Sequence, residues 1–210
     1  MTPAQSESIL ERMIARYGIP SPALEYRSLY QLVVAVVLSA QTTDSQVNAV
    51  TPSLFRRFHD FQSLAGADIA EVETIIKSTG FYRNKAKNIT LLARDIVHNH
   101  GGTVPENREE LMRLPGVGRK SANVILAMGF NIPAFAVDTH VLRVANRIGY
   151  CATDDPLKVE TSLTSIIPET MWIPGHLLFI THGRRTCRAR NPLCPECAIN
   201  DLCAFAGKTL

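Results

Sequence analysis

The sequence has 210 residues, of which 46% are hydrophobic and 20% charged, with 22 Lys and Arg against 19 Asp and Glu. This ordinary globular composition excludes extensive disorder, and the length suits one large domain or two small ones. The longest uninterrupted apolar run, at residues 32–38, is far shorter than the ~18 residues that cross a bilayer, and residues 1–8 are polar. We therefore expect neither a membrane span nor a secretory signal. A net charge of +3 is too small to identify a nucleic-acid partner.

Apolar residues recur with a helical period along most of the chain. In residues 4–17 and 84–98 they fall on one face of a helix. The apolar run at 32–38 is ambiguous, because its valines favour a strand whereas its position between polar helical stretches favours a buried helix; we predict a helix. Further helices are expected at residues 46–58, 68–78, 108–113, 120–130, 139–148, 156–167 and 176–186. No stretch alternates as hairpin strands do, so the sequence predicts an all-α protein.

Short segments rich in Gly, Pro, Asn or Asp separate these helices, and none is long enough to be a free linker. They lie at residues 18–22, 101–105, 114–118, 131–133 and 153–156. From the positions of these segments we expect one helical domain over residues 22–132 and another from about residue 133 onward.

The segment LMRLPGVGRKSANVILAMGF at 111–130 predicts a short helix, a tight turn and a longer helix that begins near Arg119. Gly116 and Gly118 permit backbone conformations that a side chain disfavours, and they leave amide N–H groups uncovered where the second helix starts. Such a helix-hairpin-helix binds an anion, for example a DNA phosphate, without reading any base. On the turn alone, a plain connection between helices is equally acceptable. Two nucleotide motifs are excluded: GVGRKS lacks the third glycine of a dinucleotide fingerprint, and Arg119 stands where a Walker loop has Gly.

Lys120 lies in the first turn of this second helix, where the helix dipole and the neighbouring Arg119 both disfavour a further cation. A neutral amine there would be a nucleophile, but from these residues alone a surface lysine that contacts phosphate is the simpler interpretation. Asp138 opens the run DTHVLRVANRIG and is expected to cap the helix that follows, which does not exclude catalysis. The intervening chain is long enough for Asp138 to return beside Lys120.

Four of the five cysteines lie close together near the end of the sequence. Their pattern is Cys187-x6-Cys194-x2-Cys197-x5-Cys203. Because a cytosolic protein keeps its thiols reduced, this clustering indicates metal ligation rather than disulfide bonds. Four thiolates suit tetrahedral zinc or an iron-sulfur cluster, and one close pair flanked by two single ligands favours the cluster. Cys151 stands apart, and we interpret it as a small buried hydrophobe.

Four cations occupy seven residues around the first of these cysteines, namely Arg184, Arg185, Arg188 and Arg190. A solvated charge run is the usual interpretation of such a stretch. A loop tied by cysteine ligands at both ends would instead hold the arginines as a local basic patch that suits phosphate.

The run LPGVGRKSANVILAMGF, followed by VDTHVLRVANRIG and the four cysteines, resembles the endonuclease III family of helix-hairpin-helix DNA glycosylases and abasic-site lyases. The likeness covers nearly the whole chain and includes LSAQTTD at 38–44 and GFYRNKAKNI at 80–89. It implies two helical domains, residues 22–132 with the hairpin and residues 1–21 plus 133–210 with the cysteines, flanking a DNA-binding cleft. By motif, it makes Lys120 the Schiff-base nucleophile and Asp138 the catalytic carboxylate.

The resemblance implies removal of oxidised pyrimidines in base excision repair. A damaged nucleotide flips out of the duplex, and the Lys120 amine attacks the sugar C1′ as the base leaves. Asp138 stabilises the charge on the sugar or shuttles the amine proton, and β-elimination then cuts the strand 3′ to the lesion. One alternative is a mismatch or adenine glycosylase of the same superfamily, against which Lys120 argues. The other is a non-catalytic DNA-binding iron-sulfur protein.

The resemblance also implies that Gln41 and the residue after Gly80 fill the hole left in the base stack. Here that residue is Phe81, where relatives carry Leu; from the sequence alone Phe81 would be a buried core aromatic. Asp44 either lines the base pocket or only caps the helix that follows.

A 4Fe-4S cluster on the four cysteines is the implied cofactor, and we expect it to be structural. The implied phosphate contacts are Gly116, Gly118, Arg119, Arg184 and Arg190, and Asn191 stands where relatives often carry Lys, so one contact is missing. We expect a cytoplasmic, nucleoid-associated monomer whose partner is double-stranded DNA with damaged bases or abasic sites.

Overall fold

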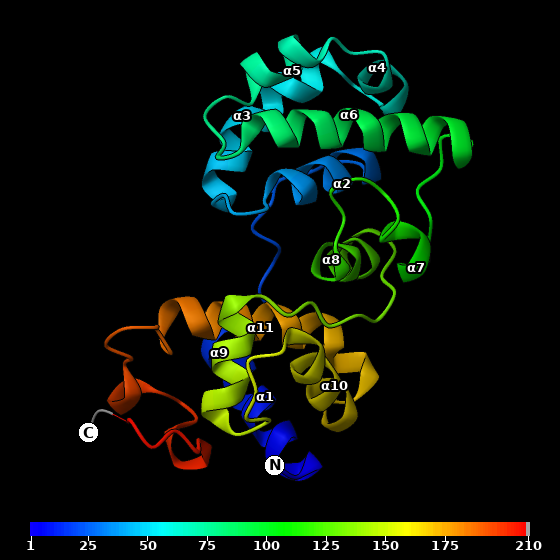
Figure 1. The fold of residues 1–210 in the computed structure, drawn as a ribbon. Coiled ribbons are helices and arrows are strands. Elements are labelled where there is room, and N and C mark those ends of the chain that lie inside the picture. The colour runs from blue at the N-terminus through cyan, green and yellow to red at the C-terminus, as the bar shows by residue number, and fades with distance from the viewer. Residues whose placement is uncertain (209–210) are drawn as a thin grey trace. The chain divides into compact units, whose positions relative to one another are not determined.

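The computed structural model describes residues 1–208, which form α-helices, turns and three short 3-10 segments without any β-strand (Figure 1). The all-α prediction is thus confirmed. The helices are α1 (Pro3–Tyr17), α2 (Leu29–Leu38), α3 (Asp44–Arg57), α4 (Phe61–Ala65), α5 (Ile69–Ile75), α6 (Tyr82–Asn99), α7 (Arg108–Leu111), α8 (Arg119–Gly129), α9 (Thr139–Ile148), α10 (Pro156–Ile166) and α11 (Trp172–Arg185). The 3-10 segments are η1 (Glu169–Met171), η2 (Cys194–Glu196) and η3 (Asn200–Leu202). No helix within residues 1–208 combines the length and apolarity needed to span a bilayer.

The chain divides into two compact units. The first, here called the hairpin unit, consists of Pro22–Ile132. The second, the cysteine unit, combines Met1–Ser21 with the chain from Pro133 onward. Helix α1 therefore belongs to the same unit as the four clustered cysteines, although more than a hundred residues separate them in sequence.

Helix α2 forms the centre of the hairpin unit. Every residue from Leu32 to Leu38 is buried, because α3, α6 and α8 pack around the helix. A helix that is apolar on all sides is stable only in such a position. Ser28 starts the helix by accepting a hydrogen bond from the Gln31 amide at 3.3 Å. Figure 1 shows α6 lying between α2 and the pair α4 and α5.

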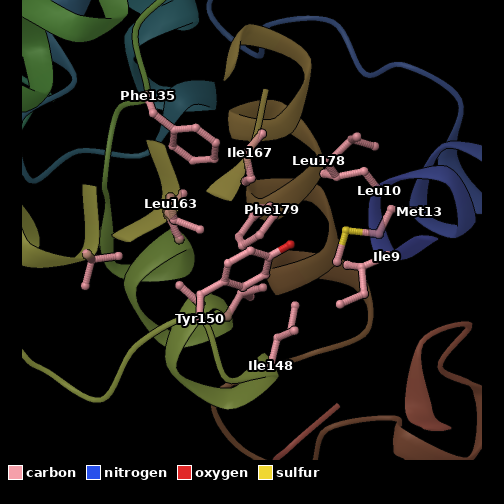
Figure 2. Packing of buried hydrophobic residues seen from close by; sticks show 14 of the residues in the cluster. Ile9, Leu10, Met13, Phe135, Ile148, Tyr150, Leu163, Ile167, Leu178 and Phe179 are labelled. Carbon is pink, nitrogen blue, oxygen red and sulfur yellow. The ribbon is translucent and has the colours of Figure 1, made fainter. Parts of the chain in front are cut away.

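The core of the cysteine unit is formed by side chains from α1, α9, α10 and α11 (Figure 2). Phe179 of α11 lies at its centre and makes edge-on ring contacts with Phe135 and Tyr150, at centroid distances of 5.8 and 5.5 Å. Helix α1 contributes its apolar face and also a buried hydrogen bond of 2.7 Å between Ser6 Oγ and the Tyr150 hydroxyl. Cys151 is half-buried against this core.

Most predicted helix boundaries lie within three residues of the observed ones, and two differences are larger. Helix α4 was not predicted, because five residues are too short to display a period; it forms where Asp60 and Ser63 make a reciprocal capping box. Helix α11 begins at Trp172, four residues before the predicted start, and passes through Pro174. Proline is tolerated in a first turn, where its missing N–H would have no helical partner.

Candidate active site and cysteine cluster

The hairpin turn is a tight chain reversal from Leu114 to Val117, closed by a 3.1 Å bond from the Val117 amide to the Leu114 carbonyl. Gly116 has φ +80°, which is the value that the third position of a type II turn requires. A Cβ at Gly116 would lie 3.0 Å from Val37 Cγ1 and 3.1 Å from Asn88, so the turn rests directly on α2 and α6. The hairpin is therefore fixed to the core of its unit.

Helix α8 begins at Arg119, with Gly118 as an N-cap that has no side chain to satisfy the first amides. Within residues 1–208 the amides of Gly116 and Gly118 donate no hydrogen bond. Lys120 is exposed in the first turn and forms no ion pair within the hairpin unit. Uncovered amides, the positive end of a helix dipole and an exposed lysine together form a site for an anionic ligand.

Asp138 is the N-cap of α9, and its Oδ1 accepts a hydrogen bond from the Val141 amide at 2.8 Å. This contact occupies one carboxylate oxygen of a half-buried side chain, so capping leaves the second oxygen for other chemistry. His140 follows in the first turn, where burial lowers its pKa more than the Asp138 charge raises it. The lowered pKa favours the neutral form of His140 beside the Asp138 carboxylate.

Gln41 and Phe81 both have left-handed backbone conformations, with φ of 52° and 55°. The Phe81 residue is 66% exposed, so the interpretation as a core aromatic, which the sequence alone favoured, is wrong. Gln41 is exposed as well. Their loops are neighbours, since a Cβ built on Gly80 would lie 3.8 Å from the Gln41 carbonyl oxygen. For residues of these types such conformations are strained and cluster at functional sites.

Asp44 does not cap the helix that follows it. The N-cap of α3 is Thr43, whose hydroxyl accepts the Gln46 amide at 3.3 Å, and Asp44 is the first helical residue. Asp44 is half-buried and already engaged with other groups.

The four clustered cysteines line one pocket of about 340 Å³, which includes space open to solvent. Burial raises the pKa of Cys197 and of Cys203. Within residues 1–208 no three His, Cys, Asp or Glu side chains converge closely enough to hold one ion. Four thiols that line one pocket, without three ligands gathered around a single point, fit an iron-sulfur cluster better than a lone zinc.

The basic loop between the first two cysteines is held by Arg147 of α9. The Arg147 guanidinium donates to the carbonyls of Arg188 and Ala189, at 2.7 and 3.1 Å, and lies 3.6 Å from Cys187 Sγ. The side chains of Arg184, Arg185, Arg188 and Arg190 are exposed. Asn191 has φ 50°, a conformation that asparagine tolerates better than most residues. The residue that replaces the expected lysine thus suits the backbone of this loop.

The sequence prediction missed Lys85 of α6 and its partner Thr42 in the loop that carries Gln41. Lys85 is buried, and its Nζ donates to Thr42 Oγ1. A signal was present, because Lys85 precedes Ile89 by four residues and Leu92 by seven and so lies on the apolar face of its helix. A second missed contact is the 2.7 Å bond from Arg108 Nε to buried Asn123 Oδ1, which ties α7 to α8.

Comparison with known proteins gives concordant results. The family model of the HhH-GPD superfamily of base excision DNA repair proteins matches residues 34–169. Endonuclease III of Synechocystis sp. is 49% identical over 185 residues, which are 88% of this chain and 84% of that protein. Endonuclease III of Escherichia coli K12 is 39% identical over 208 residues, which are 99% of both chains.

Solved structures agree with the sequence relatives. A trapped covalent intermediate of endonuclease III with DNA superposes with a TM-score of 0.92 at 43% identity, covering 97% of this chain and 96% of that chain. A non-covalent complex of endonuclease III with DNA gives the same values.

Proposed function

The chain belongs to the endonuclease III family of HhH-GPD DNA glycosylases, and on this premise we propose which of its residues perform the reaction. The protein is a bifunctional DNA glycosylase and abasic-site lyase of base excision repair. We infer that it removes oxidised pyrimidines, with Lys120 as the nucleophile. The observation that supports this most is the 43% identity, over 97% of this chain, to an endonuclease III trapped as a covalent intermediate with DNA, which the exposed Lys120 amine at the start of α8 can form.

The Lys120 amine attacks C1′ of the damaged nucleotide, and the bond from C1′ to the base breaks with its electron pair leaving on the base. The amine loses a proton, and its lone pair then forms a carbon–nitrogen double bond to C1′ as the C1′–O4′ bond breaks, which opens the sugar ring and leaves a protonated O4′ hydroxyl. This imine makes the C2′ hydrogen acidic, so that its removal expels the 3′ phosphate by β-elimination. Water then hydrolyses the imine and regenerates Lys120. An amine is required because water as nucleophile would release the base without cutting the strand.

Asp138 provides a carboxylate for the positive charge that develops on the sugar as the base leaves. It also takes the proton that the attacking amine must lose. The fixed position of its Oδ1 on the Val141 amide holds the side chain in one orientation, so no rotation is needed during the reaction.

DNA is held by the hairpin and by the basic loop. The amides of Gly116 and Gly118, with Arg119, bind a phosphate at the start of α8, while Arg184 at the end of α11 and Arg190 of the basic loop bind further phosphates. Gln41 and Phe81 enter the duplex and fill the space that the flipped nucleotide vacates. Their exposure and left-handed backbones support this role.

Cys187, Cys194, Cys197 and Cys203 hold a 4Fe-4S cluster, for which the pocket that they line together supplies four thiolate donors. When bound, the cluster cross-links the loops that carry the four cysteines, and it takes no part in the chemistry on the sugar. Arg147 keeps the basic loop in place from the side of α9.

Borohydride trapping tests the nucleophile. We expect the purified protein to become covalently linked to a duplex with one abasic site, and Lys120→Ala to give no adduct. Lys87→Ala, at an exposed lysine of α6, is the matched control and should trap normally. Undiminished trapping by Lys120→Ala would refute the assignment.

A panel of duplexes, each with one altered base, tests the substrate class. We expect base release and nicking with thymine glycol and no release of adenine opposite 8-oxoguanine. The reverse pattern would favour an adenine glycosylase of the same superfamily.

A further inference from the structure

Lys85 is an unusual residue to find inside the hairpin unit. Only 4% of it is exposed, and its Nζ donates to Thr42 Oγ1 without a carboxylate in salt-bridge range among residues 1–208. It also lies in the second turn of α6, still near the positive end of the helix dipole. Burial lowers the pKa of Lys85, as expected for an amine removed from water. A buried, uncompensated lysine is costly, so stability alone does not explain it.

The contact partner of Lys85 places it at the junction of two loops. Thr42 directly follows Gln41 in the loop between α2 and α3, whereas Lys85 lies four residues after Phe81, and its amide donates to the Phe81 carbonyl at 3.1 Å. The side chain of Lys85 thus contacts the loop that carries Gln41, and its backbone amide bonds to Phe81. Gln46 crosses the same junction, because its Nε2 donates to the Ser78 carbonyl at 2.9 Å.

We propose that Lys85 is a positioning residue that clamps the Gln41 loop to the Phe81 loop, so that both side chains are held ready to enter the DNA together. The proposal rests on the proposed role of Gln41 and Phe81. Left-handed backbones at these two residues persist only if the surrounding structure imposes them. The Lys85 side chain ties Thr42 to α6, and the first helical bond of α6, from the Lys85 amide to the Phe81 carbonyl, joins Phe81 to the same turn. Its amine performs no chemistry on the sugar.

The test compares Lys85→Met with Lys87→Met. The first variant keeps the length and volume of the buried side chain but removes its donor and charge, and the second changes an exposed lysine of the same helix. We expect Lys85→Met to slow single-turnover cleavage of an abasic duplex about tenfold, with Lys87→Met unchanged. Cleavage of a single-stranded abasic oligonucleotide should be the same for both, since a single strand has no stack to fill.

Two further readouts separate positioning from a merely structural role. The melting temperature of Lys85→Met should be equal to or higher than that of the parent protein, because a buried charge is lost. With 2-aminopurine opposite the lesion, the fluorescence change on binding should be smaller for Lys85→Met, because the orphan base is less often contacted. A lower melting temperature with equal losses on duplex and single strand would mean that Lys85 only supports folding, and would overturn the proposal.

The other side of the clamp is tested with Thr42→Val and Thr42→Ser. Valine removes the acceptor at constant shape and should reproduce the duplex defect, whereas serine keeps the hydroxyl and should preserve activity. In the double variant Thr42→Val with Lys85→Met the two losses should not add, as expected for partners in one contact. Independent, additive losses would contradict the proposal. If the parent protein itself fails to trap on abasic DNA, it is the proposed function that fails and not the clamp.

Discussion

Gly116 and Gly118 are two residues apart in the hairpin, yet the structure constrains them differently. Gly116 has a positive φ, and a Cβ there would press on Val37 and Asn88. Gly118 has an extended backbone with φ −92°, and a Cβ there meets nothing within 4 Å. The first glycine is therefore needed for folding, and the second only for access to its amide.

We expect Gly116→Ala to lower the free energy of unfolding by about 1–3 kcal/mol, because a left-handed backbone and two close contacts are both strained. Gly118→Ala should lower it by less than about 1 kcal/mol, because alanine caps a helix less well than glycine but meets no steric strain here. Urea unfolding of both variants measures the difference. Equal destabilisation would show that the turn adapts to a side chain at either position.

A second residue-scale prediction separates the two roles of Asp138. Asparagine caps helices about as well as aspartate, whereas alanine lacks the acceptor. Asp138→Asn should therefore keep the stability of the cysteine unit and still lose about 100-fold in base release, since it has no charge. Asp138→Ala should lose the same activity and in addition ~1 kcal/mol of stability. Substantial base release by Asp138→Asn, measured in single-turnover assays, would show that Asp138 serves only as a cap.

At the scale of the element, features set by neighbouring residues could be predicted from the sequence, whereas contacts between distant residues could not. The turn at residues 114–118 and the helix of Lys120 follow from neighbouring residues, so they were predicted closely. The apolar run at 32–38 needed its flanks to be identified as a helix. The contact of Lys85 with Thr42 joins residues 43 positions apart, and the left-handed backbone of Phe81 carries no mark in its neighbouring residues, so no local pattern contained either.

Helix α1 offers a pH-dependent prediction, because Ser6 bonds to buried Tyr150. Burial raises the pKa of Tyr150 to about 12, against 10.0 for the free side chain. Above pH 10 the unfolded state therefore binds fewer protons than the folded state, and stability falls as the pH rises toward 12. The loss is at most ~1.4 kcal/mol per pH unit. In Tyr150→Phe, the free energy of unfolding, measured with denaturant between pH 8 and 11, should fall less steeply with pH than in the parent protein. An equally steep fall in the variant would mean that other groups cause it.

At the scale of the whole molecule, the net charge is small although several arginines are concentrated in and next to the basic loop. Arg190 projects from this loop, whereas Arg56 lies 12 residues beyond the start of α3, about 18 Å along the helix from the Gln41 loop. If Arg190 binds a phosphate, Arg190→Ala should make the slope of log affinity against log salt shallower by about 0.9. Arg56→Ala should leave the slope unchanged. Titrations of an abasic duplex at several salt concentrations measure both, and equal slopes in all three proteins would remove Arg190 from the interface.

The cysteine unit is assembled from two stretches of chain that are made at different times. Helix α1 leaves the ribosome first, but its packing partner α11 is complete only at residue 185. At ~5–20 residues per second, the apolar face of α1 stays uncovered for about ten to thirty seconds of synthesis. The cysteine unit can therefore fold only after α11 has been made, whereas the continuous hairpin unit can fold as soon as residue 132 has left the ribosome.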